Sequence, residues 1–245
     1  DGASAGPNRF EFADGTVWSR QRLMELATQP LTIDGGSGDD LIAGGTGADT
    51  LRGLAGNDAI LAGGGEDYAV AGDGNDILEG GAGYDWMYAG NGNDSLSAGT
   101  EGAYLMGQEG DDTYLFDRGH GDVSVNDEDA GGGFDVIRFA AGIASSEVSF
   151  FRSGTDLRVA INGTADAMVV YRHFDATSTF HQIEAVRFDD GTEWLRAYID
   201  AMATVQLDGG PGDDVLYGTA SGDVMHGNGG ADSIYGNDGN DTLLG

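Results

Sequence analysis

The feature that most constrains this chain is an aspartate that recurs every nine residues. A glycine-rich hexad such as Gly35-Gly36-Ser37-Gly38-Asp39-Asp40 leads to each aspartate, and an apolar residue usually follows two places later. The first run comprises Asp40, Asp49, Asp58, Asp67, Asp76, Asp85, Asp94 and Asp112, and a second run comprises Asp214, Asp223, Asp232 and Asp241. A short fixed period is typical of a solenoid, in which each repeat stacks on its neighbours.

The repeat itself predicts how the chain winds. Glycine permits the backbone angles of a tight turn, and the alternation around each apolar residue predicts a short strand with one side chain inward. Turn, strand, turn, strand gives a flattened coil in which one winding takes two repeats, so residues 18 apart stack. One edge is then expected to carry Asp40, Asp58, Asp76, Asp94 and Asp112, and the other Asp49, Asp67 and Asp85. The second row should stop there, because Ala103 comes next.

Stacked carboxylates require positive charge between them. At a strand spacing of roughly 4.8 Å, each pair repels by about 3 to 4 kcal/mol at an effective dielectric near 20. Carboxylates and turn carbonyls suit Ca²⁺, which accepts several oxygens in flexible geometry, whereas Mg²⁺ demands a stricter octahedron. The chain has no cysteine and the rows contain no histidine, which argues against zinc. We therefore predict several calcium ions between turns two repeats apart, and not a disordered acidic linker.

Composition narrows the class of function. The 245 residues include 42 Asp and Glu against 11 Lys and Arg, a net charge of −31, which disfavours binding to nucleic acid or to an anionic membrane. Without cysteine the chain cannot form disulfides, so we expect bound metal to stabilise the fold in their place. No stretch reads as a membrane span or a signal peptide. The chain looks like a segment of a longer protein.

A second, longer repeat is visible outside the hexads. Phe12, Asp14 and Trp18 match Phe188, Asp190 and Trp194 at an offset of 176 residues. Each copy predicts a strand, an Asp-Gly-Thr turn and a short helix, Ser19–Ala27 or Leu195–Ala203. The helix should cover the end of a coil, as capping elements do in solenoids. Its second copy should bury Tyr198, Ile199 and Met202.

Between the two runs, the nine-residue period disappears and alternating stretches predict short strands. These are 122–125, 136–139, 148–152, 157–161, 168–171 and 183–188, with a hairpin at Asn162-Gly163. Tyr114 and Phe116 are expected to plug the first coil, and the aromatics of the module, Phe134 and Tyr171 among them, to form its core. We predict four units: an N-terminal cap (1–33), a first β-roll block (34–115), a β-rich module ending in a capping helix (116–206) and a truncated second block (207–245).

The hexads resemble a known family. GGSGDD, GGTGAD, AGDGND, GGAGYD, GGPGDD and GNDGND are similar to the RTX (repeats-in-toxin) nonapeptides of bacterial type I secreted proteins. The stretch TYLFDRGHGD…FDVIRFAAGI…DLRVAINGT…IEAVRFDDGTEW resembles the haemolysin-type calcium-binding related module. The resemblance implies an all-β fold of right-handed parallel β-roll blocks that bind calcium between turns. It also implies export unfolded through a type I secretion machinery and folding outside the cell.

The resemblance also implies a set of metal ligands. These are the twelve repeat aspartates named above, together with backbone carbonyls of the hexads. The hexad glycines concerned are Gly35, Gly36, Gly38, Gly44, Gly45, Gly47, Gly53, Gly56, Gly80, Gly81, Gly83, Gly209, Gly210 and Gly212. Ala62, Ala71, Ala89 and Ala98 depart from the pattern at the first hexad position, and we expect strain there because alanine tolerates positive φ poorly.

Other chemistry is less well supported. The carboxylate pairs recur in one register, so no unique acid–base pair indicates an enzyme, and the four histidines are expected on the surface. Asp127, Glu128, Asp129 and Asp135 beside Gly131-Gly132-Gly133 form either an extra calcium site or a solvated loop. Three functions remain open: a calcium-dependent folding module for type I secretion, a calcium-stiffened spacer of a surface adhesin or surface layer, and a carbohydrate- or receptor-binding module at 116–206.

Overall fold

The computed structural model describes residues 9–11, 17–19, 28–175, 177, 180–218 and 222–245. Apart from a single 3-10 turn, η1 (Ser145–Glu147), and one short helix, α2 (Arg196–Met202), the regular elements of these residues are all β-strands. The helix predicted over Ser19–Ala27 lies largely outside the described residues. None of the described helices is long and apolar enough to cross a membrane.

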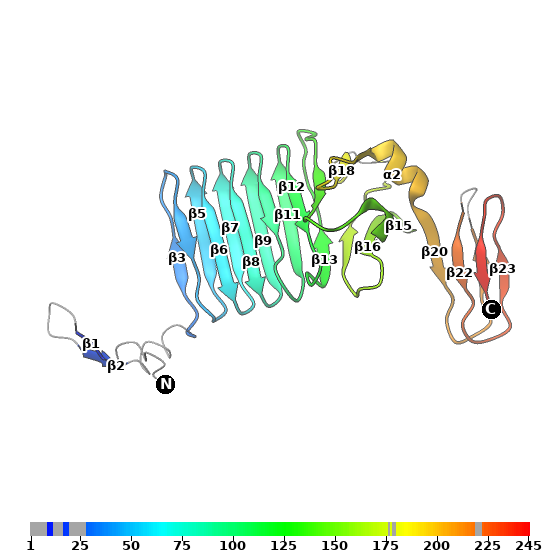
Figure 1. Cartoon of the computed structure of the whole chain (residues 1–245), viewed down its shortest axis with the longest axis horizontal. Coiled ribbons are helices and arrows are strands. Elements are labelled where there is room, and N and C mark those ends of the chain that lie inside the picture. The colour runs from blue at the N-terminus through cyan, green and yellow to red at the C-terminus, as the bar shows by residue number, and fades with distance from the viewer. Residues whose placement is uncertain (1–8, 12–16, 20–27, 176, 178–179, 219–221) are drawn as a thin grey trace.

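The first block is a coil of two parallel sheets that face each other, as the nine-residue period predicts (Figure 1). One sheet contains β3 (Thr32–Asp34), β5 (Thr50–Ala55), β7 (Tyr68–Asp73), β9 (Asp85–Asn91), β11 (Ala103–Glu109) and β13 (Asp122–Val125). The other contains β4 (Leu41–Ala43), β6 (Ala59–Gly64), β8 (Ile77–Ala82), β10 (Ser95–Ser97), β12 (Thr113–Phe116), β14 (Val136–Phe139) and β18 (Ala185–Arg187). Leu51 pairs with Ala69 and Ile60 with Leu78, so residues 18 apart are neighbours throughout the repeats.

The narrow core between the sheets is filled by two inward positions per repeat. The apolar residue after each aspartate is one of them, and Leu51, Ile60 and Leu78 have no exposed surface. The first hexad residue is the other: Ala62, Ala71, Ala89 and Ala98 are also fully buried, and none has a positive φ. The expectation of strain at these alanines is therefore wrong, because the first hexad position is still extended and simply contributes a methyl group to the core.

The backbone turns left-handed at the second and fourth positions of most hexads. At the second position Gly63 has a φ of +106°, but Leu54 and Gln108 adopt φ values of 86° and 77°. In the second block, Asn228 and Asn237 do the same at 68° and 66°. A leucine in this region is strained by the contact between its Cβ and the backbone, whereas asparagine tolerates it better.

Replacing Leu54 by glycine should stabilise the folded chain by about 1 kcal/mol, because it removes the left-handed strain from a side chain that is 51% exposed. Thermal unfolding in saturating calcium should shift upward by about 2 to 4 °C. Leu61→Gly is the matched control: Leu61 lies within β6 without a positive φ, so glycine should lower the unfolding temperature there. A decrease for both variants would contradict the assignment of strain to Leu54.

The coil does not end where the nonapeptides end. β12 pairs in parallel with β14 and β14 with β18, while β13 pairs with β17 (Ala167–Val170). Tyr114 and Phe116 are buried inside this continuing stack, so the prediction that they plug its far end is wrong. The reason is visible in Asp135-Val136-Ile137, which keeps the inward apolar residue two places after an aspartate.

The predicted β-rich stretch adds a meander to one sheet. β15 (Val148–Ser153), β16 (Asp156–Ile161) and β17 pair antiparallel, which confirms the hairpin predicted at Asn162-Gly163. Phe116, Phe139, Phe150 and Phe188 are buried as expected. Phe134 and Tyr171 are instead 40% and 37% exposed, so they do not belong to the core.

The longer repeat has a structural counterpart. β1 (Arg9–Glu11) pairs antiparallel with β2 (Val17–Ser19), with Phe10 opposite Trp18. β18 pairs in the same way with β19 (Glu193–Leu195), with Val186 opposite Trp194, which reproduces the register at an offset of 176 residues. The predicted helix follows as α2, but of its predicted apolar face only Ile199 is buried, while Tyr198 and Met202 are each 47% exposed.

A second, shorter set of parallel windings follows α2 (Figure 1). β20 (Thr204–Asp208), β22 (Val224–His226) and β24 (Thr242–Leu244) form one sheet, and β21 (Val215–Tyr217) pairs with β23 (Ser233–Tyr235) in the other. β20 also pairs with β15, so the sheet of the meander leads into this block. The 18-residue register therefore resumes after the insertion.

Candidate metal centre

Most repeat aspartates accept one hydrogen bond from a backbone N–H of the preceding winding. The backbone N–H of Asp40 donates to Oδ1 of Asp58 at 2.8 Å, and that of Asp58 to Oδ1 of Asp76 at 2.7 Å. On the opposite edge, Asp49 donates to Asp67 at 2.7 Å and Asp67 to Asp85 at 2.9 Å. The two rows that the spacing predicts are thus aligned along the two edges of the coil.

The second carboxylate oxygen has no such partner in the interior of the rows. Oδ2 is buried without a hydrogen bond in Asp58, Asp67, Asp76, Asp85, Asp94 and Asp112. In the outermost turns the arrangement differs: the N–H of Gly36 donates to Oδ2 of Asp40, and that of Gly45 to Oδ2 of Asp49, each at 2.6 Å. Buried anionic oxygens without partners are costly, and a cation is the group that they lack.

A backbone carbonyl of the next winding lies close to Oδ2 of several repeat aspartates, including outer ones whose Oδ2 also accepts an N–H. A methyl group placed on Gly35 would lie 2.6 Å from the carbonyl oxygen of Gly53 and 2.8 Å from Oδ2 of Asp40. One placed on Gly209 would lie 2.6 Å from the carbonyl oxygen of Gly227 and 2.9 Å from Oδ2 of Asp214. Carboxylate and carbonyl oxygens that converge in this way are the hard ligands that calcium accepts.

The electrostatics of the rows indicate that these carboxylates are unfavourable as bare anions. Burial, with a smaller contribution from the charge of the preceding aspartate, raises the pKa of Asp67 to about 6 and the pKa values of Asp85 and Asp94 to about 7. The pKa of Asp112 rises to about 8, again chiefly because of burial. A cation beside each row would remove this penalty, because it favours the ionised form.

One row is longer than the sequence period suggests. The N–H of Asp112 donates to Oδ1 of Asp135 at 2.8 Å, and that of Asp135 to Oε2 of Glu184 at 2.9 Å. Asp135 was expected only within an acidic cluster, and Glu184 was not expected in the row at all. Because the intervals are 23 and 49 residues, no fixed spacing reveals them. The signal was the repeated acid-x-apolar pattern in Asp135-Val136-Ile137 and Glu184-Ala185-Val186.

The other row stops at Asp85, as predicted. Ala103 pairs beside Asp85, Val123 beside Ala103 and Met168 beside Val123. All three of these apolar side chains are buried. From this point the edge contributes to the hydrophobic core instead of carrying carboxylates, so the two edges of the coil are chemically different in its second half.

The second block repeats the geometry on a smaller scale. Asp214 donates its N–H to Oδ1 of Asp232, and Asp223 to Oδ1 of Asp241, each at 3.0 Å.

Among the carbonyls predicted as ligands, those of Gly36, Gly45 and Gly210 accept backbone hydrogen bonds from later windings at 3.0 to 3.3 Å. Each keeps a second lone pair, so these bonds leave them able to contact a cation.

Across the described residues, no three carboxylate or imidazole groups close into a ready-made metal cage. Each candidate site therefore consists of one or two carboxylates supplemented by backbone carbonyls.

The histidines do not contribute to the rows, although two of them are not on the surface as expected. His173 and His181 are 2% and 4% exposed, and His173 accepts a hydrogen bond from the N–H of Ile183 at 3.1 Å.

Family models match much of the chain. The model of the RTX calcium-binding nonapeptide repeat matches residues 34–69, 70–101 and 208–243. The model of the haemolysin-type calcium binding protein related domain matches residues 156–198. Among curated proteins, none matches the chain. The aligned aspartate rows lie largely within the first set of matches and the antiparallel meander partly within the second. The chain therefore carries two blocks of RTX calcium-binding nonapeptide repeats, and a haemolysin-type calcium binding protein related domain lies between them.

Proposed function

We propose that this chain is a folding module of a larger secreted protein, in which calcium binding and folding are a single event. The observation that carries the proposal is the set of buried Oδ2 atoms without hydrogen-bond partners along the two rows. The ligands would be the repeat aspartates, Asp214, Asp223, Asp232 and Asp241 included, with hexad carbonyls. Because the carboxylates of the rows occupy equivalent positions, they support a structural role for the metal and no catalytic one.

The charge of the chain explains how such a module would respond to its surroundings. At −31, the calcium-free chain repels itself and resists compaction. Extracellular calcium modules bind with dissociation constants of roughly 10⁻⁴ to 10⁻³ M, so they stay empty at cytosolic calcium levels. A chain that is unfolded inside the cell suits type I export, and millimolar calcium outside would then drive folding by mass action.

A calcium titration followed by far-UV circular dichroism tests this proposal. In EGTA at a pH of about 7.5 we expect the spectrum of a mostly unfolded chain, and millimolar calcium should produce the β-sheet spectrum in one cooperative step. Magnesium at the same concentration is the control and should produce little change, because it loses its water reluctantly. A full β-sheet spectrum in EGTA, unchanged by calcium, would overturn the proposal.

A second candidate function is a stiff spacer in a longer array. It is favoured by one observation, the β1–β2 hairpin that reproduces the β18–β19 hairpin in register 176 residues earlier. A module that repeats as a whole would join coil to coil and extend the protein along one axis. Small-angle X-ray scattering of the chain in calcium should then give the profile of an elongated rod, whereas flexibly linked blocks would disfavour this role.

A further inference from the structure

Four aromatic rings form an exposed strip on the outer face of the first repeat block. Tyr68 on β7 pairs beside Trp86 on β9, and Trp86 pairs beside Tyr104 on β11. Tyr88 lies two residues after Trp86 on the same face, with its ring centroid 5.3 Å from that of Tyr68 and 6.1 Å from that of Tyr104. Tyr68 and Trp86 are 42% and 37% exposed. We call these four residues the aromatic strip.

Neutral polar side chains extend the strip into the inserted module. The Tyr104 hydroxyl accepts a hydrogen bond from Nδ2 of Asn126 at 2.9 Å, and the Ser124 hydroxyl lies 3.3 Å from that of Tyr171. Val169 pairs beside Ser124 and continues the row. Among the described outward residues of the two rows that hold the strip, none is charged from β7 to β17, although the chain has 42 acidic residues. Five strands at a spacing of roughly 4.8 Å make this uncharged surface about 19 Å long.

The opposite sheet shows that the coil does not need these rings. Its outward residues in the described strands β4 to β14 include Leu61, Ile77 and Ser95 but no aromatic residue. The packing between the two sheets depends on the inward residues, which are buried in both. Exposed aromatic residues that gather on one face only therefore indicate a binding surface and not a requirement of the fold.

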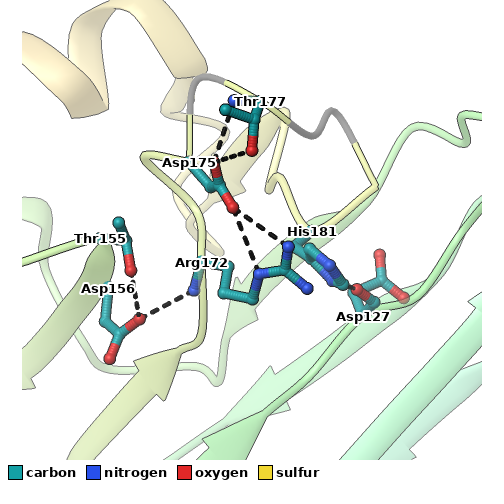
Figure 2. A network of polar contacts seen from close by, with 7 residues as sticks. All are labelled: Asp127, Thr155, Asp156, Arg172, Asp175, Thr177 and His181. Atoms are coloured by element: carbon teal, nitrogen blue, oxygen red, sulfur yellow. Dashed lines mark hydrogen bonds and ion pairs between the residues drawn. The ribbon is translucent and has the colours of Figure 1, made fainter.

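A hollow of about 350 Å³ lies where the strip reaches the inserted module. It is lined by Glu128, Arg172 and Phe180, among others, and the Glu128 carboxylate accepts a hydrogen bond from Asn126 at 3.1 Å. Figure 2 shows how Arg172 is held, with its guanidinium paired to Asp175 at 3.1 Å. The hollow thus combines an aromatic ring with a few fixed polar groups, as small-molecule sites do.

The charges around the strip limit the class of ligand. At a net charge of −31 the chain repels anionic polymers, nucleic acid and acidic polysaccharides included. Because Asp175 neutralises the Arg172 guanidinium, Glu128 makes the hollow acidic as well. Tyrosine and tryptophan rings offer apolar surface with a polar group at the edge. Sugars have the complementary chemistry, since C–H groups cover the faces of each sugar ring and hydroxyl groups surround it.

We propose that the aromatic strip binds an uncharged, linear glycan that lies across β7 to β17 and ends in the hollow. The length of the uncharged surface favours an extended chain of sugars over a single sugar. This function goes beyond calcium-dependent folding. It also differs from the carbohydrate-binding role considered for residues 116–206, because all four rings of the strip belong to the first repeat block.

Isothermal titration calorimetry of the whole chain in saturating calcium tests the proposal, with cellohexaose, mannohexaose and chitohexaose as uncharged probes. At least one of them should bind, and an alginate hexasaccharide, which is anionic, should bind more weakly. If none of the three uncharged probes binds, or if the anionic one binds more tightly, the proposal is wrong. Far-UV circular dichroism of the same samples reports calcium-dependent folding separately, so a failure of the glycan site is distinguishable from a failure of the proposed function.

Substitutions of exposed tyrosines locate the site. Tyr68→Ala should weaken binding of the glycan by about tenfold or more, because it removes a stacking ring, whereas Tyr68→Phe keeps the ring and should stay within about threefold. Tyr235→Ala is the matched control: Tyr235 is a 50% exposed tyrosine of β23, outside the strip, and its loss should leave the affinity unchanged. An equal loss in Tyr68→Ala and Tyr235→Ala would mean that sugars adhere to any exposed ring, which contradicts a defined site.

A protein partner on the strip would give a different result. Sedimentation velocity of the calcium-loaded chain should show a monomer. A dimer that Tyr68→Ala abolishes, and that none of the hexasaccharides dissociates, would make the strip a contact between two copies of the chain and would overturn the glycan site.

Discussion

Replacing Asp76 by asparagine should lower the free energy of unfolding of the calcium-bound protein and raise that of the calcium-free protein. Asp76 lies in the middle of its row, where Oδ1 accepts the N–H of Asp58 at 2.7 Å and Oδ2 is buried without a partner. Asparagine keeps the Oδ1 acceptor and loses only the charge. With calcium bound, the loss of one ligand from a buried ion pair should cost about 3 to 5 kcal/mol. Without calcium, the loss of a carboxylate whose pKa is raised, chiefly by burial, should be stabilising.

Urea unfolding of both proteins, with and without calcium, measures these opposite effects. Asp122→Asn is the matched control, because Asp122 carries the same side chain at an exposed position of β13, outside both rows. Its effect should stay within about 0.5 kcal/mol in either condition. A loss of stability in Asp76→Asn that is equal with and without calcium would show that the carboxylate acts through packing and not through a cation.

In the absence of calcium, acidification should stabilise the folded state. In the folded chain the pKa values of Asp67, Asp85, Asp94 and Asp112 lie at about 6, 7, 7 and 8, above the value near 3.8 expected in the unfolded chain. A raised pKa means that protonation favours the folded state. This contribution is complete below a pH of about 4 and is lost as the pH rises through about 6 to 8. Because four such groups titrate over the same range, the combined dependence of stability on pH should be steep.

Circular dichroism in calcium-free buffer checks this dependence. The β-sheet signal should grow as the pH falls from about 8 to about 5, a range that stays above the isoelectric point of about 4.1. With saturating calcium the same range should change the signal little, because the carboxylates are then engaged. If the β-sheet signal of the calcium-free chain declines on acidification, the buried carboxylates of the two rows are more stable in the folded chain as anions than as protonated groups.

The sequence predicts the repeats well because their physics is local. Hexad and apolar residue recur at a fixed interval, and this alone determines the winding, the 18-residue register and the two aligned rows. The fixed interval could not predict that the row continues beyond Asp112. Asp135 follows after 23 residues and Glu184 after a further 49, and the meander of β15 to β17 lies in this second interval. Residues that become neighbours across an insertion are not separated by a regular interval in the sequence. The burial of Asp127 depends on the same tertiary arrangement, so the sequence does not show it either.

The misjudged glycine positions have a different cause. Alanine at the first hexad position suggested strain, yet the strain belongs to later hexad positions, where Leu54, Glu101 and Gln108 adopt positive φ. Composition shows that a hexad is rich in glycine but does not show which of its members turns left-handed. The exposure of Phe134 and Tyr171 was missed for a similar reason, since an aromatic residue reads as core in a sequence until its neighbours are known.

The hydrogen bonds that fix the rows all run in one direction, and this gives the coil a polarity. In each row the donor belongs to the earlier winding and the acceptor carboxylate to the later one, up to Asp135 and Glu184. At these side-chain contacts the later winding contributes the carboxylate and the earlier winding the N–H, whereas the backbone bonds beside them run the other way, as when the N–H of Ala59 donates to the carbonyl of Asp40. The two ends of the row are therefore unequal, because the N–H of Glu184, at the C-terminal end, donates to the backbone carbonyl of Asp135 and not to a further carboxylate.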